Sequence, residues 1–108
     1  MRQPPAARHE HPEIDVAALE AARAADRLLA GAREGGLTRW ETYLAPMPDR
    51  LRDAPLPEVR ATARRARAAY GPKDSIRDAL PAELTEPFLD AIDRLIRALN
   101  REELARGR

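Results

Sequence analysis

Residues 15–33 read DVAALEAARAADRLLAGAR, and this stretch decides the fold because its apolar side chains recur every three or four residues. That spacing predicts one long helix with a single buried face. We expect Asp15 to cap the start of this helix and Gly35-Gly36 to end it. Because the stripe is mostly alanine, a neighbouring helix can approach closely, but little apolar area is buried. The stripe consists of Ile14, Ala18, Ala21, Ala25, Leu28 and Ala32.

Two segments further along the chain have the same periodicity. The segment 57–70 predicts a helix of medium length, with Pro57 in its first turn. The segment 86–105 predicts a second long helix, capped by Thr85, that tolerates Pro87 in its first turn. The stripe of this last helix is the most apolar face in the chain, and it consists of Phe88, Ile92, Leu95 and Leu99.

Between these segments, prolines limit the helices to a turn or two. Thr38 and Glu41 have the spacing of a capping box, which predicts a short helix to about residue 44. Pro46 and Pro48 forbid its continuation, and a further helical turn is expected near residues 49–53. This arrangement predicts short Pro-bounded helices between the longer ones.

Trp40 and Tyr43 are half of the aromatic residues in the chain. We favour the interpretation that they anchor the core of a small bundle. The alternative is an exposed aromatic contact for a partner. The sequence does not decide between the two.

These patterns predict an all-α fold, a small helical bundle of three main helices plus short Pro-bounded helices. Valine and isoleucine together total six, too few for several strands. Residues 1–12 hold three prolines and two histidines without an apolar period, so we expect a flexible N-terminal tail. A single helical domain is then expected over residues 13–106.

The composition indicates a thin core. The chain has 108 residues, of which 25 are bulky and apolar, 22 are alanine and 18 are arginine against one lysine, with a net charge of +1. A thin core is often completed by a partner or by self-association, so we expect one of these. There is no cysteine and no uncharged apolar run near the ~18 residues of a membrane span. The N-terminus lacks the apolar stretch of a secretory signal, and we therefore expect a soluble, cytoplasmic protein.

No pattern of catalytic or metal-binding residues stands out. Ser75 is the only serine, and no histidine in the predicted helical domain can serve as its base. The group His9, Glu10, His11 and Glu13 lacks a third histidine and a scaffold that would fix its geometry. The glycines lie at helix ends rather than in a phosphate-binding loop. We expect neither an enzyme nor a site for a metal, a cofactor or a small-molecule substrate.

The segment Gly71-Pro72-Lys73-Asp74-Ser75-Ile76 resembles the attachment site of acyl carrier proteins. In that family a serine after an aspartate carries a phosphopantetheine arm at the start of a helix. The resemblance implies, as a remote alternative function, an acyl-carrier-like protein with Ser75 as its attachment site. The sequence departs from the family's pattern because Pro81 interrupts the helix that follows. The residues themselves predict that Asp74 or Ser75 caps a short helix.

Two faces are candidate partner sites. The apolar stripe of residues 88–99 is one, and the other is a basic face of the helix 57–70, formed by Arg60, Arg64 and Arg67. We therefore predict a non-enzymatic interaction module, such as an adaptor, a subunit or an antitoxin-like regulator, that binds a protein partner or itself. The alternative is a nucleic-acid-binding transcriptional regulator whose arginines contact phosphates. The arginine face could also be merely solvated, or paired with the acidic segment 74–86.

Overall fold

A computed structural model describes residues 8–107, and every regular element in that range is helical, which confirms the all-α bundle. The elements are the 3-10 turn η1 (Arg8–Glu10), α1 (Pro12–Glu34), α2 (Thr38–Leu44), α3 (Met47–Asp53), α4 (Leu56–Ala68), α5 (Ile76–Ala79) and α6 (Ala82–Arg106).

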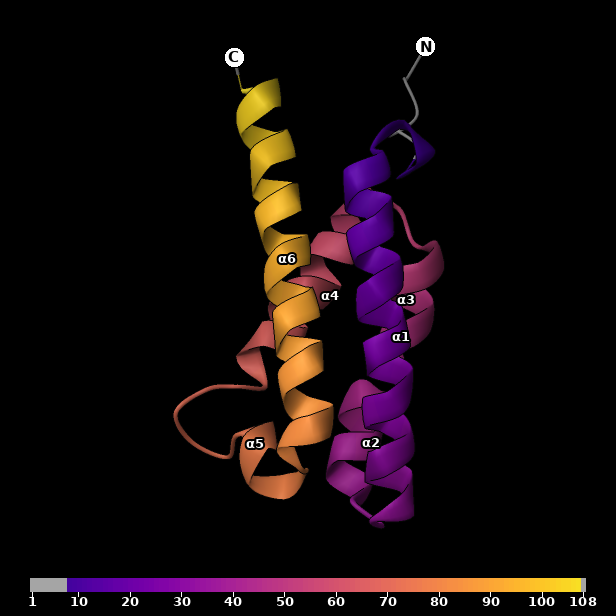
Figure 1. The fold of residues 1–108 in the computed structure, drawn as a ribbon, viewed down its shortest axis with the longest axis vertical. Helices are drawn as coiled ribbons and strands as arrows, with labels where there is room; N and C mark the ends of the chain where they lie inside the picture. The colour runs from indigo at the N-terminus through magenta and orange to yellow at the C-terminus, as the bar shows by residue number, and fades with distance from the viewer. Residues whose placement is uncertain (1–7, 108) are drawn as a thin grey trace.

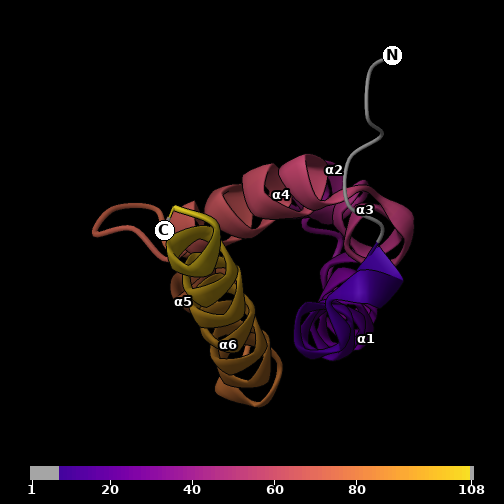
Figure 2. The same cartoon turned by 90° about the horizontal axis from the view of Figure 1, so that it is seen from above.

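The two long helices, α1 and α6, lie side by side and run in opposite directions (Figure 1). As a result, the start of α1 and the end of α6 are at the same end of the molecule. Seen from above, α3 and α4 close the back of the bundle between these two helices (Figure 2). None of the other helices in the described range lies over the front of the α1–α6 pair (Figure 2).

The core follows the predicted stripes. Every residue of the α1 stripe is at most 2% exposed, with Leu28 fully buried. Gly31 fits the close approach of α1 to the start of α6, since an added Cβ there would lie 2.5 Å from Leu84 Cδ1. Small side chains therefore permit the tight helix contacts on which this bundle depends.

Trp40 and Tyr43 belong to the bundle rather than to an open contact surface. Trp40 is 8% exposed, and its ring meets the ring of Tyr43 edge-on, with 5.6 Å between centroids. Tyr43 is half-buried, and its hydroxyl donates to the backbone carbonyl of Arg65. The interpretation of this pair as an anchor is confirmed.

The predicted start of the first helix was wrong. α1 begins at Pro12, with His11 at the N-cap position and no side-chain cap. Asp15 lies in the first turn, where its carboxylate is 3.1 Å from the Arg8 guanidinium. Helical structure is therefore present in residues 8–10 and at Pro12, within the segment expected to be a tail, while residues 1–7 lie outside the described range.

The predicted start of the last helix was also wrong. α6 begins at Ala82 with Pro81 at the N-cap position, and Thr85 lies inside the helix and is buried. The backbone N–H of Thr85 donates to the Pro81 carbonyl at 3.0 Å, which closes the first turn before Pro87. Pro87 then removes only one backbone donor near the start of the helix. The Thr38 capping box is not formed either, because Leu37 occupies the N-cap position of α2.

Candidate interaction surface

The apolar stripe of the last helix is the core of the bundle, not an open surface. Phe88, Ile92 and Leu95 are fully buried, and Leu99 is 2% exposed. Their face of α6 packs against α1 and α4. The expectation that these four residues meet a partner is therefore corrected, because the chain's own helices cover them.

The expected arginine face is divided by the fold. The Arg60 guanidinium donates to the Leu99 carbonyl at 3.2 Å and lies 3.2 Å from a Glu103 carboxylate oxygen. Arg67 pairs with Asp93 at 3.2 Å. Of the three, Arg64 alone is exposed without a carboxylate within 4.0 Å in the described range. Two of the three arginines thus join α4 to α6, and their partners are not in the segment 74–86.

We expect Arg60→Gln to lower the free energy of unfolding by about 1 kcal/mol, because a partly buried, charge-assisted hydrogen bond is lost. The Arg60 side chain is 23% exposed. Urea denaturation followed by circular dichroism measures the change. The matched control is Arg64→Gln on the same helix, which should change the value by less than about 0.5 kcal/mol. Equal effects of the two variants would contradict the joining role of Arg60.

A different surface, which we call the α1–α6 face, lies along the open front of the two long helices. Two adjoining grooves run along it, one of about 210 Å³ and one of about 480 Å³. Both have side chains from α1 on one side and from α6 on the other. The residues that line them are Glu13, Val16, Ala17, Glu20, Arg23, Ala24 and Arg27 of α1, and Pro87, Asp90, Ala91, Arg94, Arg97, Ala98 and Arg101 of α6.

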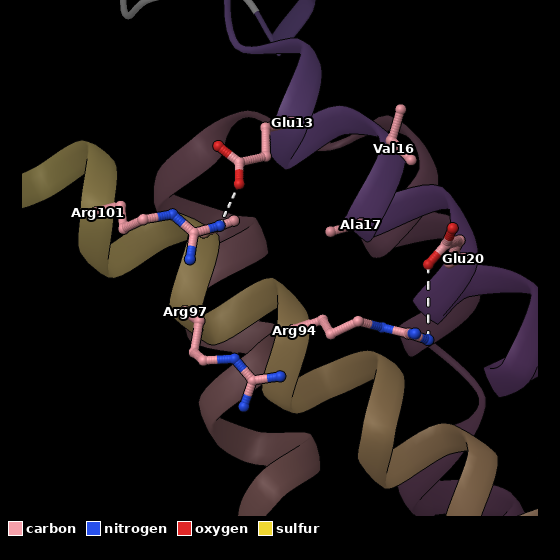
Figure 3. A pocket seen from close by; sticks show the side chains of 8 residues that line it. Glu13, Val16, Ala17, Glu20, Arg94, Arg97 and Arg101 are labelled. Atoms are coloured by element: carbon pink, nitrogen blue, oxygen red, sulfur yellow. Dashed lines mark hydrogen bonds and ion pairs between the residues drawn. The ribbon is translucent and has the colours of Figure 1, made fainter.

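Charged side chains line both edges of the α1–α6 face. Glu13 is paired with Arg101, and Glu20 lies 3.6 Å from Arg94. Arg97 leaves α6 between Arg94 and Arg101, and its side chain points away from both pairs (Figure 3). No carboxylate of the described residues lies within 4.0 Å of its guanidinium. The face therefore holds cationic groups that are available to an incoming partner.

The floor of the α1–α6 face is small and apolar. Ala17, Ala24, Ala91 and Ala98 are each 3–9% exposed. Next to this floor stands Val16, which is 57% exposed, while Leu104 near the end of α6 is 67% exposed. These are the exposed large apolar side chains among the residues described. An alanine floor allows another helix to approach closely, and the exposed valine adds apolar area.

The sequence contains a signal for this face on each long helix, although the pattern of one helix alone does not reveal the shared surface. Each long helix has two alanines seven residues apart, at positions 17 and 24 on α1 and at 91 and 98 on α6, and each of them has a charged residue three or four positions away. On one helix such a pattern is typical of the edge of a buried stripe. It becomes a shared surface only when two such helices lie side by side.

A hydrogen-bonded cluster fixes α5 and the preceding loop against α6. The buried Tyr70 hydroxyl donates to the Thr85 carbonyl, and burial raises the pKa of this phenol. The Arg77 guanidinium makes two hydrogen bonds to the Glu86 carboxylate, at 2.7 and 3.0 Å. Ser75 caps α5 as predicted, because its side chain accepts from the Arg77 backbone N–H. All of these side chains have structural partners.

The Arg77–Glu86 pair predicts a pH-dependent stability difference. The hydrogen bond from Arg77, with a second from the Thr85 hydroxyl, lowers the pKa of Glu86. A carboxyl whose pKa is lowered on folding stabilises the fold at higher pH, and this contribution is lost as the pH falls through the folded-state pKa. We expect Glu86→Gln to destabilise the protein at neutral pH, and we expect this destabilisation to be smaller at about pH 3, where protonation of Glu86 begins to remove the contribution from the original chain. Urea denaturation at both pH values tests this, and an equal difference at both would contradict it.

Within residues 8–107, no group of three or more histidine, cysteine or acidic side chains is arranged to hold a metal ion. The side chain of His9, one of the residues considered for a metal site, lies outside the described set. None of the described helices combines the length and the apolar character that crossing a membrane requires. No protein-family model matches the sequence, and no curated protein or solved structure matches the chain.

Proposed function

We propose that this chain is a non-enzymatic interaction module, such as an adaptor, a subunit or a small regulator, that binds protein on its α1–α6 face. The observation that carries the proposal is the combination, on one open surface, of an alanine floor, the exposed Val16 and Arg97, which has no carboxylate within 4.0 Å among the described residues. Protein interfaces combine such an apolar centre with a polar rim, and arginine is enriched in them.

The charges of the α1–α6 face favour a protein over a nucleic acid. The lining residues include five arginines, but also Glu13, Glu20 and Asp90. A phosphate backbone would be repelled by these carboxylates, whereas a protein helix can present both signs of charge. The basic face that would suit phosphates is reduced to Arg64 and its neighbour Arg65, because Arg60 and Arg67 are paired with α6.

Site-specific photo-crosslinking tests the proposal. A photoreactive amino acid is placed at Val16 or at Arg97 in the full chain, and the adducts formed in native extract are separated by mass. The matched control is Ala61 on α4, which lines a groove between α3 and α4 on another side of the bundle. We expect protein adducts from the first two positions and none from the third. No adduct from either position, or equal yields at all three, would overturn the proposal.

A further inference from the structure

The charges of the α1–α6 face are segregated by helix and by end. The first half of α1 carries Glu13 and Glu20, and its later part carries Arg23 and Arg27. When α6 is followed in the same direction in space as α1, its side chains on this face are basic first and acidic afterwards. Next to the acidic part of α1 lie Arg94, Arg97 and Arg101, whereas Asp90 lies next to the basic part, with the exposed Glu83 further along the same side.

The ion pairs show the register between the two helices. Glu13 meets Arg101 and Glu20 meets Arg94, so seven residues forward on α1 correspond to seven residues back on α6. By the same count, Asp90 is level with Ala24, between Arg23 and Arg27. The described range places no carboxylate within 4.0 Å of Arg23 or Arg27, and no cation that close to Asp90. These groups are available to a molecule that covers the face.

A second copy of the chain complements this pattern. A two-fold axis parallel to the helices places α1 of one copy over α6 of the other at the same level. Each acidic part then faces a basic part: Glu20 faces the partner's α6 arginines, and Arg27 faces the partner's Asp90. The pairing that holds α1 and α6 together within one chain is thereby repeated between two chains.

A two-fold axis could also lie in the plane of the face but perpendicular to the helices. The exposed apolar residues favour the axis parallel to the helices over this perpendicular one. Val16 lies near the start of α1 and Leu104 near the end of α6, so both are at the same end of the molecule (Figure 1). Leu104 follows Arg97 and Arg101 at helical spacing. An axis along the helices brings the apolar ends of the two copies together. A perpendicular axis would instead place Val16 against the charged end that carries Arg23 and Arg27.

The size of the face suits a dimer. The 23 residues of α1 span about 35 Å, and two packed helices are about 20 Å across. The resulting footprint of about 700 Å² is close to the roughly 800 Å² that each partner buries in an interface of standard size. The alanine floor permits the two helix pairs to approach closely.

We infer that a second copy of this chain covers the α1–α6 face, related by a two-fold axis that runs along α1 and α6. The inference rests on the proposed function of the face and names its occupant. The product is a four-helix arrangement of α1 and α6 from both copies, with α3 and α4 on the outer sides.

A charge exchange tests the inference with purified full-length protein. Arg27→Glu and Asp90→Arg each place like charges opposite one another in the dimer, and neither breaks an ion pair found within the described part of the chain. Sedimentation equilibrium should show a dimer for the original chain and at least tenfold weaker association for each variant alone. An equimolar mixture should regain the dimer, because in the mixed dimer one contact between positions 27 and 90 has exchanged charges, the other has the original charges, and both are attractive. Arg64→Glu on α4 is the matched control and should dimerise normally, and thermal melts verify that every variant folds.

Three results would overturn the inference. One is a monomer throughout the micromolar range, another is a dimer insensitive to both variants, and the third is a mixture that does not reassociate, since that excludes the axis along the helices. None of these results decides the proposed function. If the purified chain is monomeric while Val16 still forms adducts with a protein of different mass, the face binds another protein and only the occupant named here is wrong.

Discussion

Replacing Phe88 with alanine is expected to lower the free energy of unfolding by about 3–5 kcal/mol. Phe88 is fully buried and is the largest such side chain in the described core. The loss combines the transfer free energy of the ring with the cavity left among helices that cannot fully collapse. Urea denaturation followed by circular dichroism measures it, with the slope of the transition checked for a change in the unfolded state.

The matched control for Phe88 is Leu104→Ala on the same helix. Leu104 is 67% exposed, so its removal should change the stability by less than about 0.5 kcal/mol. If Phe88→Ala is as stable as the original chain, the phase assigned to α6 is incorrect and its apolar stripe does not face the core.

Leu95→Ala is expected to cost about 2–5 kcal/mol, because Leu95 is fully buried in the middle of the same stripe. Leu95→Met keeps nearly the same volume and should cost less than about 1.5 kcal/mol. Thermal and urea denaturation of the two variants distinguish the effect of a cavity, which Leu95→Ala creates and Leu95→Met does not, from a general intolerance of substitution at this position. A Leu95→Ala variant that keeps its stability but loses association would instead mean that the residue meets a partner.

The buried faces of the long helices were predictable because helical spacing and apolar character agree there. Ile14, Leu28 and Leu99 are buried because each lies on the only apolar stripe of its helix. Such a stripe must turn inward wherever the helix packs. The burial of Trp40 follows from the same rule, although the sequence left an exposed contact open.

The helix starts were harder to predict because two local signals compete. Asp15, Thr38 and Thr85 are good capping residues, but none of them is at the N-cap position of its helix. In α1 and α6 the helix begins at or just after a proline, Pro12 or Pro81. Proline already fixes the backbone angle that a first helical turn requires.

The surface could be predicted only in part, because polar residues do not reveal their neighbours. Arg60, Arg64 and Arg67 look alike in the sequence, yet Arg60 and Arg67 border the core side of α4 and reach α6, while Arg64 points away. The α1–α6 face likewise depends on which two helices are adjacent and on their register. Neither property follows from the periodicity of one helix.

Covering of the α1–α6 face is tested most directly by cysteine protection, since the chain has no cysteine of its own. Val16→Cys and, as a control, Ala61→Cys are treated with a small maleimide, once as dilute purified protein and once in concentrated native extract. We predict that labelling at position 16 slows markedly in the extract while labelling at position 61 does not. The purified sample is diluted until sedimentation shows a monomer, and equal labelling rates at position 16 in that sample and in the extract would then show that nothing covers this face and would contradict its role in binding.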